Sequence, residues 1–188
     1  MGRPRGAALT AEQVVAAGLA VVAEQGEDAL GTASVARALG IRPPSVYHHF
    51  AGNDALRHAV AVEGWKALVA SLPAPGDDPA DALRGFARAY RAFALANPAL
   101  YRLMTRVPFD PTDPALLEVT ARGFAALQRL GIPPDQALHA IRALRAAVHG
   151  FVDLELSGQV RLGVPADDSF EWLVELGARG LAGGSDGR

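Results

Sequence analysis

Residues 35–50 read VARALGIRPPSVYHHF, and this stretch decides how the rest of the chain is interpreted. Three of its positions meet the steric demands of two short helices that cross at a tight turn. Ala36 is small where the helices approach each other, Gly40 can adopt the positive φ of the turn, and Val46 can pack the second helix on the first. The offsets of four and then six residues are those of a helix-turn-helix.

The second helix of this pair carries side chains that form hydrogen bonds rather than pack. Such side chains suit phosphate oxygens and the edges of bases, so the pattern favours contact with double-stranded DNA. The alternative is a pair of unrelated short helices in a helical bundle. The polar side chains on the second helix are Arg42, Ser45, Tyr47, His48 and His49.

The sequence around this stretch predicts helices and no convincing strand. Thr10 with Gln13 three residues later indicates a capped helix start, and Gly, Pro and Asn punctuate the later segments. The fold class is therefore expected to be all-α, with about nine helices. We expect them at about residues 10–25, 32–39, 43–50, 53–72, 79–96, from 98 onward, 114–130, 134–157 and 167–182.

Composition excludes several classes of protein. The 188 residues are half hydrophobic, enough to bury a sizeable core, and include no Cys, which removes disulfides, thiolate catalysis and zinc fingers. A net charge of −2 argues against a nonspecific coat on nucleic acid but leaves room for a specific reader. No apolar stretch approaches the roughly 20 residues that span a bilayer, so we expect a cytoplasmic protein without a membrane partner.

Residues 10–57 resemble the DNA-binding domain of the TetR family of transcriptional regulators. Residues 40–50 carry the resemblance, as a Gly, a few polar or Pro positions and then an aromatic pair that brackets His. The resemblance implies a core of Ala36, Leu39, Ile41, Val46 and Phe50. It also implies DNA contacts from Arg42, Pro44, Ser45, Tyr47, His48, His49 and Asn53, with Tyr47 and His49 on the phosphate backbone.

Two positions depart from the family's pattern. A Lys that grips a phosphate usually begins helix four, and here that position is Asn53, which can donate a hydrogen bond but carries no full charge. A Ser or Thr usually caps helix two, and here Gly31 precedes Thr32. One phosphate contact per subunit therefore comes into question.

The resemblance implies two domains. We expect a helix-turn-helix domain in residues 1–52 and a helical domain for effector binding and dimerisation in residues 53–188. Within the second, residues 148–151 are similar to a His-Gly-containing helix that one subgroup of TetR carboxy-terminal domains shares. The arm that precedes the first helix carries Arg3 and Arg5, which either enter a minor groove or are incidental charges at a chain end.

A series of aromatic residues in the middle of the chain is the candidate effector site. Each residue alone fits a core position, but together they supply the apolar walls of a helix-lined pocket, with Arg88 or Arg91 as polar anchors and residues 107–114 as a lid. We expect a largely apolar effector with at most one acidic or carbonyl group. The candidate ligand-binding residues are Trp65, Phe86, Tyr90, Phe93, Tyr101, Met104, Phe109, Phe124 and His149.

The last two helices carry apolar stripes that predict a homodimer, because a reader of palindromic DNA needs two copies. The alternative is that both stripes lie inside the monomer. The candidate interface residues are Leu138, Ile141, Val148, Val152, Phe170, Leu173, Val174 and Gly177.

These patterns together favour a ligand-responsive regulator, most simply a repressor. The five His residues lack the spacing of metal ligands, and no nucleophile elbow or phosphate-binding loop is present, so we expect no metal, no cofactor and no enzymatic activity. The alternative function is an all-α enzyme or carrier with a remnant helix-turn-helix.

Overall fold

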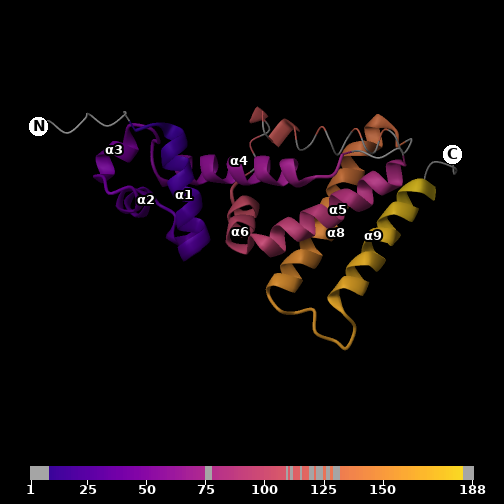
Figure 1. Cartoon of the computed structure of the whole chain (residues 1–188). Coiled ribbons are helices and arrows are strands. Elements are labelled where there is room, and N and C mark those ends of the chain that lie inside the picture. Colours follow the sequence, from indigo (N-terminus) through magenta and orange to yellow (C-terminus); the bar gives the residue numbers. More distant parts are fainter. Residues whose placement is uncertain are drawn as a thin grey trace, which may run out of the picture. The chain divides into compact units, whose positions relative to one another are not determined.

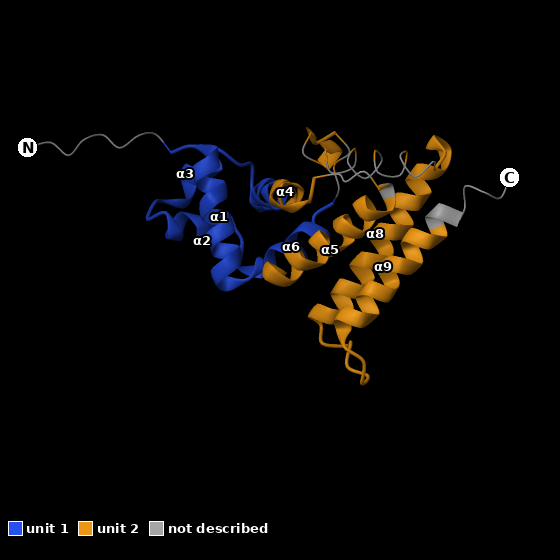
Figure 2. Cartoon of the chain, turned by 45° about the vertical axis from the view of Figure 1, so that its right-hand side comes forward, with its two compact units in different colours: residues 1–64, 99–109 blue, residues 65–98, 110–188 orange. Residues whose placement is uncertain are grey.

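The computed structural model describes residues 9–74, 78–108, 110, 112–114, 116–118, 121, 125, 128 and 132–183 of the chain. Every regular element within these residues is a helix, which confirms the predicted all-α class (Figure 1). The chain divides into two compact units, coloured separately in Figure 2. Unit 1 comprises residues 1–64 and 99–109, and unit 2 comprises residues 65–98 and 110–188. The predicted functional boundary after residue 52 stays a prediction, since compactness does not test it.

Unit 1 begins with a helix whose two ends are set by local sequence. The Thr10 hydroxyl accepts a hydrogen bond from the Gln13 amide at 3.3 Å, and the Gln13 side chain accepts one from the Thr10 amide at 3.1 Å, so the predicted capping box is confirmed. Gly26, with φ of 89°, ends the helix. The helices of this unit are α1 (Ala11–Gln25), the 3-10 helix η1 (Glu27–Ala29), α2 (Thr32–Ala38), α3 (Pro43–Tyr47), the first part of α4 (Asn53–Ser71) and most of α6 (Pro98–Arg106).

The turn between α2 and α3 has the predicted geometry. Gly40 has φ of 65°, a conformation that favours glycine, and Ala36 and Val46 are buried where the two helices pack. α3 ends at Tyr47 rather than near residue 50 as predicted. Residues 48 and 49 form a turn instead of continuing the helix. The 3-10 helix η1 was not predicted, since three residues offer no periodicity.

Close helix crossings hold the rest of unit 1 together. A Cβ atom on Gly18 of α1 would lie 2.7 Å from the Val60 side chain of α4, and one on Gly64 of α4 would lie 2.6 Å from the Met104 sulfur of α6. Both distances are too short for any side chain, so glycine permits these helices to approach. Helix α4 is thereby packed against α1 and α6 by its buried face.

Unit 2 consists of the end of α4 with α5 (Pro79–Ala96), α8 (Pro134–Leu156) and α9 (Ala166–Gly183). Helices α5, α8 and α9 pack against one another, and the Phe151 and Phe170 rings lie 5.3 Å apart between α8 and α9. The bounds of α5 agree with the prediction, because Asp78 caps its first turn and Asn97 follows its last residue. Most of the helix predicted at residues 114–130 lies outside the described residues.

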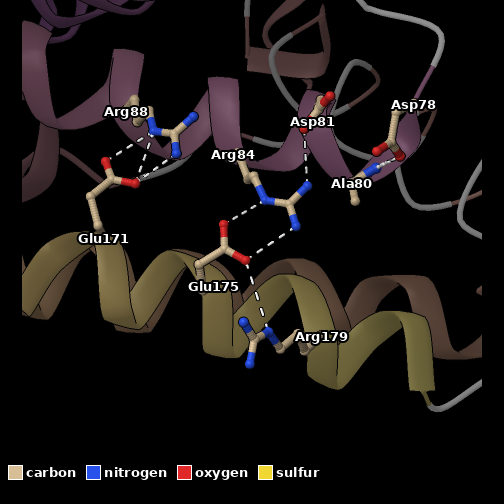
Figure 3. Close-up of polar contacts among 8 residues, drawn as sticks. All are labelled: Asp78, Ala80, Asp81, Arg84, Arg88, Glu171, Glu175 and Arg179. Carbon is tan, nitrogen blue, oxygen red and sulfur yellow. Dashed lines mark hydrogen bonds and ion pairs between the residues drawn. The ribbon is translucent and has the colours of Figure 1, made fainter.

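A row of ion pairs fastens α5 to α9 (Figure 3). Arg84 lies 2.7 Å from Glu175, and Arg88 lies 2.6 Å from Glu171, so partners four residues apart on one helix face partners four residues apart on the other. Hydrogen bonds from Arg88 and Arg84 lower the pKa values of Glu171 and Glu175 respectively. These carboxylates therefore stay ionised to a lower pH in the folded chain.

Arg91 completes the row and joins three helices. Its guanidinium lies 2.6 Å from Glu155 of α8 and 2.6 Å from Asp167 of α9, and it stands over the Phe170 ring at 4.9 Å. The side chains of Arg91 and Glu155 are only 13% and 17% exposed. Removal of one partner from an ion pair this sheltered leaves a poorly hydrated charge without compensation. It therefore costs more free energy than removal of one partner from an exposed pair.

Replacement of Arg91 by Met should destabilise the chain far more than the same change at Arg88. Arg91→Met leaves a sheltered carboxylate without its guanidinium, which costs on the order of 2 kcal/mol, whereas Arg88→Met breaks a solvent-exposed pair worth under about 1 kcal/mol. Urea unfolding at pH 7 and fixed protein concentration measures both. Equal losses for the two variants would contradict this account of the row.

Candidate DNA-binding, effector and dimer sites

Polar side chains of the helix-turn-helix face solvent around α3. Arg42, Pro44, His48 and His49 are exposed, and Ser45 is half-buried. Val46, between them, is fully buried against α2. The helix thus directs an apolar side chain inward and leaves its polar side chains available to a partner.

Thr32, the first residue of α2, forms hydrogen bonds with side chains of α3 and α4. The Thr32 amide donates a hydrogen bond to Oδ1 of Asn53 in α4 at 2.9 Å, and the Thr32 hydroxyl donates one to the Tyr47 hydroxyl oxygen in α3 at 3.2 Å. Tyr47 nevertheless remains 55% exposed. Ser34 accepts a hydrogen bond from the Gly31 amide at 3.0 Å. The role of Asn53 toward α2 was missed from sequence, where it was considered only for DNA.

A buried carboxylate ties α6 to the turn after α1. Glu27 lies 3.0 Å from Arg102 and 3.2 Å from Arg106, both on α6, while its side chain is only 8% exposed. Arg57 of α4 donates a hydrogen bond to the Glu27 carbonyl at 2.7 Å. Sequence reasoning missed this cluster, because the arginines follow Glu27 by 75 and 79 residues and no local pattern connects them.

The candidate ligand-binding residues divide between the two units. In unit 2, Trp65 and Tyr90 are buried, and the Phe86 ring lies 6.2 Å from the Tyr90 ring on the same helix. Phe93 and His149 are half-buried in the same unit, and Tyr101 and Met104 are buried in unit 1. The assignments at Phe109 and Phe124, like those at Arg3 and Arg5, lie outside the described residues.

The polar groups near these aromatics differ from those expected. Arg88 and Arg91 are engaged by carboxylates of α8 and α9. Arg145 of α8 instead lies over the Trp65 ring, with its guanidinium carbon 5.5 Å from the ring centroid. Within the described ranges no carboxylate forms an ion pair with Arg145, and its guanidinium faces the Trp65 ring.

The candidate dimer residues of α8 and α9 have unequal exposure in the single chain. Leu138 is exposed, while Ile141, Leu173 and Gly177 are half-buried. Sequence reasoning missed two exposed apolar side chains of α9, Trp172 at 69% and Leu176 at 53%. The two residues are four positions apart and so share a face of α9, outside the stripe that was chosen from sequence. Four candidate residues are buried within the monomer, namely Val148, Val152, Phe170 and Val174.

An apolar cavity of about 310 Å³ opens beside these residues. Its walls come from α5, α8 and α9 and consist only of Ala, Gly, Leu and Val, including Leu144, Leu176 and Gly177. Leu176 both lines the cavity and is exposed to solvent. Leu176 therefore connects the cavity to the exposed surface of α9.

Within the described part of the chain, no three His, Asp or Glu side chains gather as they would around a metal ion. None of the helices described combines the length and the apolar composition that crossing a bilayer demands.

Comparison with known proteins agrees with the geometry of both units. Residues 14–60, from α1 into α4, match the family described as bacterial regulatory proteins, tetR family, and residues 83–176 match the tetracyclin repressor-like C-terminal domain. The chain belongs to the TetR family of transcriptional regulators. An uncharacterised helix-turn-helix transcriptional regulator of Mycobacterium tuberculosis is 34% identical to it over 184 residues, which cover 94% of this chain and 84% of that one.

Solved structures of TetR-family proteins share the fold. Apo ActR from Streptomyces coelicolor superimposes with a TM-score of 0.81 at 21% identity, covering 96% of this chain and 98% of its own. A TetR variant of Acinetobacter baumannii in complex with minocycline gives a TM-score of 0.72 at 26% identity, covering 95% of this chain and 97% of its own. The resemblance first noted in residues 10–57 thus extends over nearly the whole fold.

Proposed function

We propose that the chain is a homodimeric cytoplasmic repressor that binds palindromic operator DNA and is released by a small, largely apolar effector. The observation that carries this proposal is the arrangement of α3. Tyr47 in α3 and Arg42, His48 and His49 beside it are exposed, while Val46 fixes the helix to α2, which is what reading DNA requires of a short helix. The match of residues 83–176 to a repressor-like domain supports repression over activation.

The exposed side chains are assigned two kinds of DNA contact. Arg42, Pro44, Ser45 and His48 are proposed to face the base edges of the groove, where differences in hydrogen bonding give specificity. Tyr47, His49 and Asn53 are proposed to bind phosphate oxygens, which position the protein without reading sequence. Contacts from the arm with Arg3 and Arg5 remain a prediction.

Substitutions on α3 should separate these roles. Ser45→Ala or His48→Ala should change which bases are preferred, because each removes a group assigned to a base edge, at a cost of about 1–3 kcal/mol at one position. Tyr47→Phe should weaken binding to all duplexes by a similar factor, about fivefold for one hydrogen bond. Selection from random duplexes at moderate salt, followed by affinity measurement, tests both.

Two outcomes of that experiment would count against the proposal. A changed base preference in Tyr47→Phe would show that the assignment of Tyr47 to phosphate is wrong. Absence of any sequence-selective binding by the unchanged protein would favour the alternative, an all-α enzyme or carrier with a remnant helix-turn-helix. Melting temperatures of each variant, measured without DNA, control for loss of the Thr32 hydrogen bond to Tyr47.

The dimer is proposed to form on the exposed apolar area of α8 and α9. Leu138, Trp172 and Leu176 are large, apolar and exposed, and the cavity beside Leu176 provides a surface of small residues that a partner helix could enter. Burying such an area against a second copy removes it from water and pairs the two DNA-binding units about a two-fold axis. The buried candidates Val148, Val152, Phe170 and Val174 would then support this face from within.

A charge at Leu176 should dissociate the dimer, while the same charge elsewhere should not. Leu176→Asp would place an unpaired carboxylate in a desolvated interface, at a cost of several kcal/mol. Leu162→Asp is the matched control, since Leu162 is 94% exposed in the segment between α8 and α9. Light scattering at micromolar concentration should report a monomer for the first variant only. A monomeric unchanged protein, or a dimeric Leu176→Asp, would contradict the proposed face.

The effector is proposed to bind on the aromatic residues of unit 2. Trp65, Phe86, Tyr90 and Phe93 supply apolar contacts, and Arg145 over Trp65 offers a positive charge to an acidic or carbonyl group of the ligand. The remaining candidates, Tyr101, Met104, Phe109, Phe124 and His149, stay predictions. The minocycline complex of the Acinetobacter TetR variant supports a small-molecule ligand in this fold.

Removal of one aromatic wall should abolish the response to ligands. Apolar molecules that raise the melting temperature of the unchanged protein should also lower its affinity for the selected duplex, by linkage. Phe93→Ala should lose both effects and retain DNA binding. Leu95→Ala, on the same helix and 40% exposed, should keep them. Stabilisation only by sugars or nucleotides, or a full response in Phe93→Ala, would place the effector elsewhere.

A further inference from the structure

At the start of α2, Ser34 of the helix itself accepts from the Gly31 amide, but the Thr32 amide is capped by a side chain from α4. A helix leaves its first amides without intrahelical partners, and a Ser, Thr, Asp or Asn immediately before the helix usually accepts from one of them. Gly31 holds that place here and has no side chain. Oδ1 of Asn53, 21 residues later, accepts from the Thr32 amide at 2.9 Å instead.

The two positions compete for the same space. A Cβ atom on Gly31 would lie 3.3 Å from Oδ1 of Asn53, which is tighter than an ordinary van der Waals contact. A Cβ atom at position 31 would therefore require the Asn53 amide to shift by a few tenths of an ångström. Glycine before α2 leaves Asn53 in its observed place without that shift.

The same helix start fixes the recognition helix. Thr32 is only 4% exposed, and its hydroxyl donates to the Tyr47 hydroxyl oxygen at 3.2 Å. With that oxygen accepting from Thr32, the Tyr47 proton is directed to another acceptor, such as a phosphate oxygen. Asn53 and Tyr47, from α4 and α3, are thus aligned through one residue of α2.

We infer that Asn53 is a positioning residue for DNA binding, which caps α2 through Oδ1 and sets the place of Tyr47 through Thr32. This inference rests on the proposed function. The two polar atoms of the Asn53 amide then have different partners. Oδ1 accepts from Thr32 within the protein, and Nδ2 is left to donate to DNA. Gly31 and Asn53 then act as a pair whose substitutions are not additive.

The test compares stability without DNA and binding with DNA for a set of variants. Stability is the melting temperature, and binding is the affinity for each of two duplexes, the one selected by the unchanged protein and one of random sequence, at a temperature where all variants are folded. The variants are Asn53→Ala, Asn53→Asp, Gly31→Ser, and Gly31→Ser combined with Asn53→Ala.

Asn53→Ala and Asn53→Asp separate the two parts of the amide. Asn53→Ala removes the acceptor and should lower the melting temperature by about 2–4 °C, the effect of a lost cap in a chain of this size. It should also lower the affinity for both duplexes severalfold, because the phosphate contact assigned to Tyr47 is displaced with it. Asn53→Asp keeps the acceptor oxygen and should keep the melting temperature. It should bind both duplexes at least tenfold more weakly, since it loses the donor and adds a negative charge near phosphate.

Gly31→Ser should have opposite effects in the two backgrounds. In the unchanged chain it crowds Asn53 and should lower the melting temperature. Combined with Asn53→Ala it can cap α2 itself and should raise the melting temperature and both affinities toward those of the unchanged protein. A merely structural cap would change the melting temperature and leave the affinities of the folded variants unaltered.

Three results would overturn the inference. These are an unchanged melting temperature in Asn53→Ala, additive effects of the two substitutions, and unchanged affinities for both duplexes in a destabilised Asn53→Ala. Failure of the proposed function gives a different result, in which the unchanged protein shows no preference between duplexes. The melting temperatures would still decide whether Asn53 caps α2, and the positioning role would fall with the DNA binding.

Discussion

Close contact between α2 and α3 is the constraint on which the DNA-binding unit depends. The helices can approach only because Ala36 is small and Gly40 accepts a positive φ, and Val46 then fills the space between them. Since α3 has only five residues in its regular part, its own hydrogen bonds cannot hold its direction. Its orientation comes from the apolar contact on one side and from Tyr47 bound to Thr32 on the other.

Unit 2 solves a different problem, the attachment of long amphipathic helices to one another. Charged residues at the α5 and α9 junction are matched in sign and spacing, so Arg84, Arg88 and Arg91 set the register of the two helices while aromatic and aliphatic side chains fill the interior. These arginines are then committed to structure, which leaves Arg145 as a cation beside Trp65. Arginines in this unit thus either form ion pairs between helices or lie over an aromatic ring. Only the three-dimensional structure shows which arginine does which.

Sequence reasoning succeeded where the determining contacts are local. The capping box at Thr10, the turn at Gly40 and the bounds of α5 each depend on residues within a few positions of one another, and the structure confirms all three. The length of α3 and the presence of η1 were missed, because marginal helices are settled by tertiary contacts. The assignments of residues to DNA, effector and dimer remain untested by the fold itself.

Contacts between distant residues were beyond the reach of periodicity. No local sequence pattern around Asn53 indicates that its side chain caps the helix that begins 21 residues earlier, at Thr32. Amphipathic patterns likewise cannot tell an apolar face buried in the monomer from one covered by a partner. Phe170 and Trp172, two residues apart, are fully buried and largely exposed, although both are large and apolar. That distinction required the arrangement of α5, α8 and α9 in space.

The Glu27 cluster has a consequence for how the chain is made. Unit 1 is discontinuous, since its α6 segment follows residues 65–98 of unit 2 in the chain and is therefore synthesised after them. Until Arg102 and Arg106 emerge, a buried Glu27 would be an uncompensated charge in an apolar setting, so its carboxylate must stay in contact with water. The amino-terminal helices therefore complete their packing late in translation, when the arginines that neutralise Glu27 arrive.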